Sequence, residues 1–211
     1  MLKPKLFVFD VDHTITVPGG ISIWEQMHNE CGTWETEGKI FLQQFLAGEI
    51  DFDEFARNDA KSWANKHIKH LDQARNKVKI TSGFSELMQK LHTEQITTAI
   101  ISSTVGQFAE YLAKSYGINY CFANPLGVKD NILDGTIDLQ VKGEDKSQIL
   151  AELAKELHLS KSEIAVAGDS RFDIPMFKHA EHTFIIANEK YKNECKYFVR
   201  DFLEVLDIIG S

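Results

Sequence analysis

The sequence contains few of the residues that characterise disulfide-rich or metal-stapled proteins. Only 3 of its 211 residues are cysteine. Cys31, Cys121 and Cys195 are widely spaced, odd in number and form no CxxC pair, which argues against a disulfide framework and against a structural zinc site. We therefore expect reduced cysteines and a cytoplasmic protein.

Long apolar runs are also missing. The run nearest the N-terminus, residues 6–9, is ended by Asp10 and is too short for the core of a signal peptide or for a membrane span. Positive charge is scarce as well, because 23 Lys and Arg residues face 31 Asp and Glu residues, a formal net charge of -8. An acidic surface repels nucleic acid and anionic lipid, so we expect neither a nucleic-acid nor a membrane partner.

Short apolar runs alternate with segments of helical spacing over most of the chain. This alternation predicts an α/β fold, a Rossmann-like core with a parallel sheet flanked by helices. The expected strands are residues 6–9, 98–101, 120–123, 164–167 and 184–187. Turn-forming residues at 129–131 and 134–135 predict a β-hairpin between positions 126 and 141.

One segment breaks the alternation, because from Trp24 to about Lys77 the pattern is helical only. Pro18, Gly19 and Gly20 form a turn just before it. The sequence therefore predicts a small all-helical cap, residues 18–77, inserted after the first strand, with an α/β catalytic core formed by residues 1–17 and 78–211.

Carboxylates follow two of the predicted strands at their C-terminal ends, where open α/β sheets bind ligands. Asp10 and Asp12 follow the first strand, and Asp169 and Asp173 follow the strand at 164–167. Two bare carboxylates about 4 Å apart repel by roughly 4 kcal/mol at an effective dielectric near 20, so such a cluster needs a cation. Oxygen ligands without clustered His or Cys favour Mg²⁺.

The remaining polar groups at this edge suit a phosphate. Ser102 offers a hydroxyl at the end of the second strand, next to backbone N–H groups that can bind phosphoryl oxygens. Lys146 opens the helix that leads to the strand at 164–167 and is favoured over Lys142 as the supporting cation. Asp10 can then attack phosphorus as a nucleophile, and Asp12 can act as the general acid and base.

These motifs resemble those of the haloacid dehalogenase-like hydrolase superfamily. They stand here, in order, as FVFDVDHT, AIIS, a helical Lys and AVAGDSRFD. The second half, with its hairpin, is most similar to the phosphoserine-phosphatase-like branch, which carries a helical C1-type cap. The resemblance implies a Mg²⁺-dependent phosphatase that hydrolyses a small phosphorylated metabolite through an aspartyl-phosphate.

The resemblance also implies roles for individual residues. Asp10 is the nucleophile and Asp12 the acid and base, and Mg²⁺ is held by Asp10, the Asp12 carbonyl and Asp169. The phosphate-binding group is Ser102, Ser103 and Lys146, and the supporting group is Asp173, Thr14 and Gly168.

The sequence departs from that branch where phosphoserine would be recognised. Residues 16–20 contain no carboxylate for a substrate amine. Arg57 lies near the position of the branch's cap arginine, but local spacing places Asp59 closer to it. Phosphoserine is therefore not predicted as the substrate, and the expected specificity residues are His13, Trp24, Arg57 and Arg171.

Two other functions remain open from the sequence. A phosphotransferase or phosphomutase can use the same aspartyl-phosphate, and a non-catalytic protein can use the same fold to bind a phosphorylated ligand. The sequence does not indicate an oligomeric state.

Overall fold

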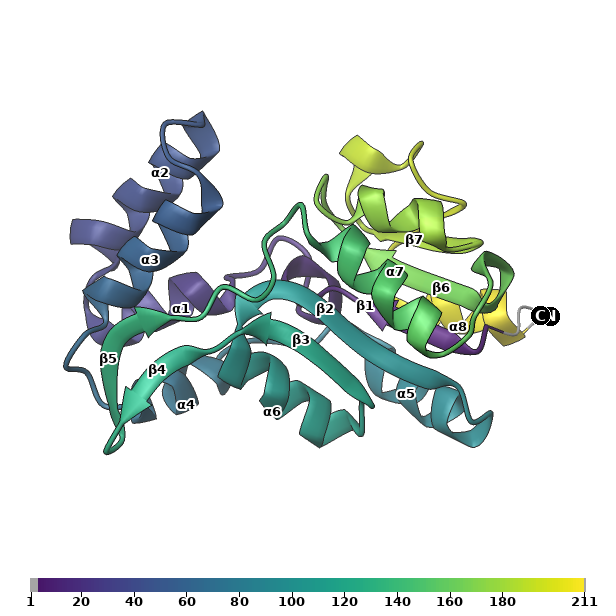
Figure 1. Ribbon diagram of the computed structural model, residues 1–211, viewed down its shortest axis with the longest axis horizontal. Coiled ribbons are helices and arrows are strands. Elements are labelled where there is room, and N and C mark those ends of the chain that lie inside the picture. The colour runs from purple at the N-terminus through teal and green to yellow at the C-terminus, as the bar shows by residue number, and fades with distance from the viewer. Residues whose placement is uncertain (1–3, 211) are drawn as a thin grey trace.

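A six-stranded parallel sheet forms the centre of the protein (Figure 1). The computed structural model describes residues 4–210, so residues 1–3 and 211 of the predicted core lie outside the described part. The strand order is β3-β2-β1-β6-β7-β8. The strands are β1 (Leu6–Phe9), β2 (Thr97–Val105), β3 (Tyr120–Asn124), β6 (Ile164–Gly168), β7 (His182–Ile186) and β8 (Tyr197–Val199).

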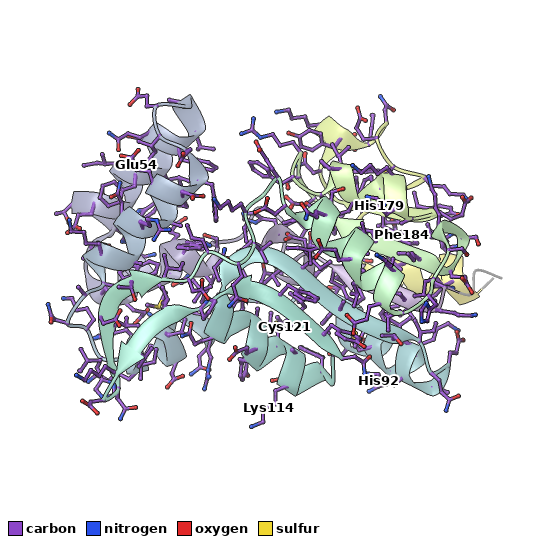
Figure 2. The ribbon with its side chains drawn as sticks, viewed as in Figure 1. Glu54, His92, Lys114, Cys121, His179 and Phe184 are labelled. Carbon is purple, nitrogen blue, oxygen red and sulfur yellow. The ribbon has the colours of Figure 1, made fainter. Side chains whose placement is uncertain are left out.

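Both faces of the sheet are covered by helices, which explains why its strands are almost uniformly apolar. Alternate residues of β1 point to opposite faces. Leu6 and Val8 pack with α7 (Lys146–Glu156), whereas Phe7 and Phe9 pack with α5 (Phe84–Thr93), α6 (Gly106–Tyr116) and α8 (Phe202–Gly210). Side chains fill these layers, as Figure 2 illustrates with buried Phe184, while Glu54 and Lys114 are exposed. The predicted fold class is confirmed.

Four of the five α-helices between β1 and β2 lie in residues 23–75, and we call this segment the cap. They are α1 (Ile23–Cys31), α2 (Lys39–Ala47), α3 (Phe52–Ser62) and α4 (Lys69–Arg75). Local capping explains two of their starts, because the Ser22 hydroxyl accepts from the Glu25 N–H and the Asp51 carboxylate accepts from the Glu54 N–H. The exact boundaries at residues 18 and 77 stay a prediction.

The predicted hairpin is present as β4 (Leu126–Lys129) and β5 (Ile132–Ile137), and it packs against the cap (Figure 1). Asp130 and Asn131 both adopt positive φ, 52° and 63°, as a two-residue hairpin turn requires. His67 forms an isolated antiparallel bridge with Ile132, so a segment of the predicted core pairs directly with the cap.

Several strands differ from their predicted extents, and β7 begins at His182, two residues before the predicted range of 184–187. β2 continues past Ile101 to Val105, because Asn124 at the end of β3 still pairs with Val105 and its amide donates to the Ser103 carbonyl at 3.1 Å. β8 was not predicted, since three residues at a sheet edge show too little alternation to be recognised. Within residues 4–210, no helix combines the length and apolarity needed to cross a membrane.

Candidate active site

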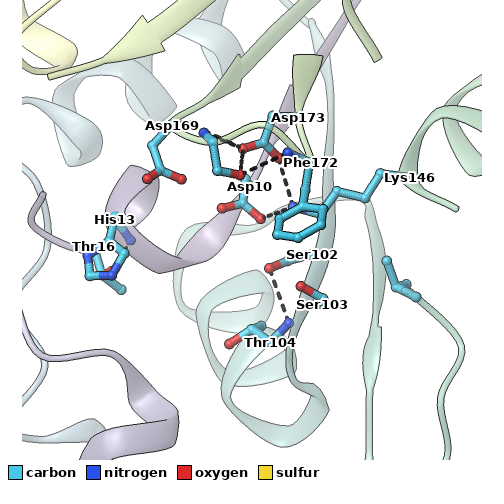
Figure 3. Close-up of polar contacts among 12 residues, drawn as sticks. Asp10, His13, Thr16, Ser102, Ser103, Thr104, Lys146, Asp169, Phe172 and Asp173 are labelled. Carbon is cyan, nitrogen blue, oxygen red and sulfur yellow. Dashed lines mark hydrogen bonds and ion pairs between the residues drawn. The ribbon is translucent and has the colours of Figure 1, made fainter. Parts of the chain in front are cut away.

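Asp10 lies at the C-terminal edge of the sheet, at the end of the central strand β1 (Figure 3). Asp10 directly follows β1, and its N–H donates to the Ala167 carbonyl of β6 at 3.0 Å, so the sheet ladder fixes its backbone. Neighbouring β2 carries Ser102, and the turn after β6 carries Asp169 and Asp173. The structure thus brings together the groups that the sequence predicted at this edge.

Lys146 is the buried cation of this group. As the first residue of α7, it places its ammonium 2.6 Å from Asp10 Oδ1 and 2.7 Å from Asp173 Oδ1. Burial opposes the charge, but the Asp10 and Asp173 carboxylates outweigh it and raise the pKa of Lys146. The lysine therefore stays protonated and holds two carboxylates in fixed positions.

Asp173 uses both carboxylate oxygens within the protein. Oδ1 accepts from Lys146, while Oδ2 accepts from the Asp169 N–H, the Ser170 N–H and the Ser170 hydroxyl at 3.1, 2.9 and 2.8 Å. Although its oxygens lie within 4.8 Å of those of Asp10 and Asp169, these bonds leave little capacity to bind an ion. Asp173 therefore shapes the turn and orients Lys146.

Asp10 and Asp169 both keep free acceptor capacity. No hydrogen bond within residues 4–210 involves Asp10 Oδ2 or the Asp169 side chain. Burial, followed by the nearby carboxylates of Asp173 and Asp10, raises the pKa of Asp169, and burial likewise raises that of Asp10 despite Lys146. Two carboxylates that resist ionisation side by side suit a hard divalent cation, and Mg²⁺ fits this donor set.

Asp12 connects this edge of the sheet with the cap. Its Oδ1 accepts from the Ile23 N–H, the first residue of α1, at 3.2 Å. His13 follows in the left-handed conformation, with φ of 62°, which turns the chain sharply after Asp12. The side chain of Asp12, the candidate acid and base, therefore binds the start of α1, a cap helix that lines the cavity.

The predicted phosphate-binding serines lie beside Asp10. Ser102 is 1% exposed, its hydroxyl accepts from the Thr104 N–H at 3.3 Å, and both Ser102 and Ser103 line the cavity described below. Thr14 is buried, and its carbonyl accepts from the Thr81 hydroxyl at 2.8 Å. Thr14 does not line that cavity, and its backbone supports the loop after β1.

Gly168 allows the close approach of Asp173. A Cβ at this position would lie 2.4 Å from Asp173 Cβ. We predict that Gly168→Ala displaces Asp173, lowers stability by about 1–3 kcal/mol and reduces the rate of the reaction at this site by about tenfold or more. Thermal melts and kcat check this against Gly210→Ala, whose added methyl meets no atom within 4 Å. Equal behaviour of the two variants would contradict this reading of Gly168.

A cavity of about 230 Å³ extends from the C-terminal edge of the sheet, which we call the catalytic edge, into the cap. Of the predicted specificity residues, His13 and Trp24 line it. Arg57 does not, because it is exposed on α3, two residues before Asp59, which does. Arg171 is exposed beside an adjoining cavity, with its guanidinium 4.7 Å from the Phe172 ring centroid. The expectation that Arg57 and Arg171 reach the substrate cavity is therefore not supported.

Several cavity residues were not named from the sequence as site residues. Those from the cap are Glu25, His28, Gly38, Leu42, Phe45, Phe52, Phe55 and Asp59. Aromatic residues at helical spacing are equally typical of a core, so the sequence does not single out these positions. Only the three-dimensional arrangement separates the ring faces that line the cavity from those that pack inside the cap.

The fold and site define a haloacid dehalogenase-like hydrolase, the family that residues 7–178 match. The chain belongs to this family, and within it to the phosphoserine-phosphatase-like branch of phosphoric monoester hydrolases.

Its relatives include a phosphoserine phosphatase from Methanocaldococcus jannaschii, which is 28% identical over 84% of this chain and 83% of the relative. A phosphoserine phosphatase from Saccharomyces cerevisiae is 30% identical over 98% of this chain and 67% of the relative. Among solved structures, a phospho-aspartyl intermediate analogue of phosphoserine phosphatase is 26% identical, with a TM-score of 0.83 over 98% of this chain and 99% of that one. A HAD family hydrolase from Salmonella enterica serovar Typhi shares the fold at 23% identity, with a TM-score of 0.90 over 100% of this chain and 72% of that one.

Proposed function

We propose that this chain is a Mg²⁺-dependent phosphatase that hydrolyses a small phosphate monoester through an aspartyl-phosphate on Asp10. The observation that carries the proposal is how the two carboxylate oxygens of Asp10 are bonded. One carboxylate oxygen is held by Lys146 at 2.6 Å, and the other has no hydrogen bond within the described residues and belongs to a residue lining the cavity. A fixed carboxylate with one free oxygen suits nucleophilic attack.

The proposed reaction has two steps. The free Asp10 oxygen attacks phosphorus, the bond from phosphorus to the leaving-group oxygen breaks, and Asp12 donates a proton to the departing alkoxide. Asp12 then takes a proton from water, which attacks phosphorus and releases phosphate together with the regenerated Asp10 carboxylate. Ser102, Ser103 and Lys146 bind the phosphoryl oxygens. Mg²⁺ would be held by Asp10, the Asp12 carbonyl and Asp169, and it would supply further charge stabilisation at those oxygens.

The expected substrate is a small phosphorylated metabolite, because the cavity is smaller than the roughly 300–1,000 Å³ of common ligand sites. The relatives are named for phosphoserine. The two residues that the branch uses for it have no counterparts here, since residues 16–20 lack a carboxylate and Arg57 lies outside the cavity. A cytoplasmic location stays a prediction from the cysteine pattern.

Asp169→Asn tests the metal requirement. We expect turnover of an aryl phosphate with Mg²⁺ to fall by about 10²-fold or more, because the metal loses a charged ligand. In the absence of Mg²⁺ we expect the variant to melt about 2–8 °C higher than the unaltered protein. A folded-state pKa above the usual 3.8 means that ionising Asp169 costs stability as the pH rises above that value, and Asn removes the cost.

The control is the unaltered protein with EDTA or with Mg²⁺. For the unaltered protein, EDTA should abolish turnover and Mg²⁺ should raise the melting temperature. The turnover and the melting temperature of Asp169→Asn should respond less strongly to these additions. Full activity in EDTA would contradict the proposed metal site.

A further inference from the structure

The cap side of the cavity has a specific charge pattern. Lys146 is the single Lys or Arg among the described residues that line it, and both its partners are already carboxylates. The Asp59 carboxylate, 1% exposed, faces His28 with Nε2 and Oδ1 2.9 Å apart, so it offsets any positive charge on that histidine. A carboxylate on the leaving group of a substrate therefore finds no free cation in this part of the cavity.

Negative charge, in contrast, is available there. Glu25 lines the cavity from the first turn of α1, and its carboxylate has no hydrogen bond or ion pair within residues 4–210. Its N–H caps onto Ser22 at 3.2 Å, which fixes the backbone at this point. An unpartnered carboxylate beside a small cavity attracts a cationic group more strongly than it does in bulk water.

Aromatic rings form much of the remaining cap wall. Phe55 contacts Trp24 and Phe45, with ring centroids 5.7 and 5.1 Å apart. Phe45 of α2 also stacks on Phe172 of the core at 6.5 Å, which closes the wall from cap to core. Trp34 lines the cavity next to His28, at 6.1 Å between ring centroids. Aromatic faces stabilise a desolvated ammonium group and its adjacent carbon atoms.

We propose that the substrates of this site are phosphate monoesters of small alcohols that carry an ammonium group and no carboxylate, with Glu25 and the aromatic wall binding the ammonium. This inference rests on the proposed phosphatase function and names its substrate class. The phosphate lies at Asp10 and Lys146, and the cation extends into the cap. Glu25 and Trp34 are then specificity-determining residues.

Three monoesters test the proposal, and the first two are nearly equal in size. Phosphoethanolamine carries the ammonium, n-propyl phosphate replaces it with a methyl group, and phosphoserine adds a carboxylate. We expect kcat/KM for phosphoethanolamine to exceed that for each of the other two by about tenfold or more. In Glu25→Gln the preference over n-propyl phosphate should fall by about tenfold, and in Trp34→Leu by about threefold.

Glu54→Gln is the matched control, because it removes the same charge from an exposed cap position outside the cavity, and it should leave the preference unchanged. The inference is overturned if n-propyl phosphate is hydrolysed as fast as phosphoethanolamine, or if phosphoserine is hydrolysed faster. If the protein still hydrolyses an aryl phosphate in that case, the proposed function stands. Loss of turnover with every ester, aryl phosphate included, contradicts both.

Discussion

Asp10→Asn is expected to abolish turnover of every phosphate monoester, by about 10⁴-fold or more, the scale on which loss of a catalytic nucleophile acts. The amide nitrogen and oxygen of Asn are far weaker nucleophiles than the carboxylate oxygen, although the side chain has the same shape. Initial rates of phosphate release from an aryl phosphate with Mg²⁺ measure the effect. Mass spectrometry of the purified variant is needed beside the assay, because slow deamidation to Asp restores activity.

The fold should survive this change. Lys146 keeps its second carboxylate partner, Asp173, at 2.7 Å, and the Asp10 N–H still donates to Ala167. A melting temperature near that of the unaltered protein therefore separates lost chemistry from lost structure. Retention of more than a few per cent of the activity in a variant free of deamidation would contradict the assignment of Asp10.

Lys146→Met has the second large effect, on activity and stability together. The substitution leaves Asp10 and Asp173 without their shared cation in a site where Lys146 is only 2% exposed. Breaking a buried ion pair by removing one partner costs about 3–5 kcal/mol. For a chain of this length that corresponds to a melting temperature lower by about 6–20 °C, measurable by circular dichroism or calorimetry.

The pH dependence of this loss has a definite sign. Burial already raises the pKa of Asp10 above its usual value. Ionisation of Asp10 therefore lowers the stability of the folded protein increasingly as the pH rises above that usual value. Without Lys146 the cost grows, and lowering the pH from about 8 to about 5 should narrow the stability gap between the variant and the unaltered protein. A gap that is constant over this range would indicate lost packing instead of an uncompensated charge.

Lys142→Met is the matched control for Lys146. Lys142 also binds an aspartate, with Nζ 2.7 Å from Asp53 Oδ2, but its side chain is 43% exposed. Exposed ion pairs contribute about 0–1 kcal/mol, so the melting temperature should change little. Similar destabilisation by both substitutions would contradict the buried role given to Lys146.

The catalytic edge could be predicted from the sequence because its residues follow buried strands. A run such as residues 6–9 is apolar on both faces only when helices cover both, and parallel strands then place their following residues along one edge. This geometry brought Asp10, Ser102 and Asp169 together, as expected. Lys146 was found for a similar reason, since it is the first residue of the helix before β6.

The cap could be predicted only in outline. Its helices follow from apolar spacing, but the face that lines the cavity depends on how α1, α2 and α3 pack together. Arg57 and Asp59 show the difficulty: they lie two residues apart on α3, and only the tertiary structure determines that Asp59 faces the cavity. The contact of the β4–β5 hairpin with the cap depends in the same way on long-range packing.

Trapping the phosphorylated enzyme tests the central proposal most directly. The protein is mixed with excess aryl phosphate and Mg²⁺, quenched in the steady state and treated with borohydride, which reduces an aspartyl-phosphate to homoserine. Peptide mass spectrometry should then find homoserine at position 10, and none when substrate is omitted. Rapid turnover with homoserine at no position, or at an aspartate other than Asp10, would contradict the proposed mechanism.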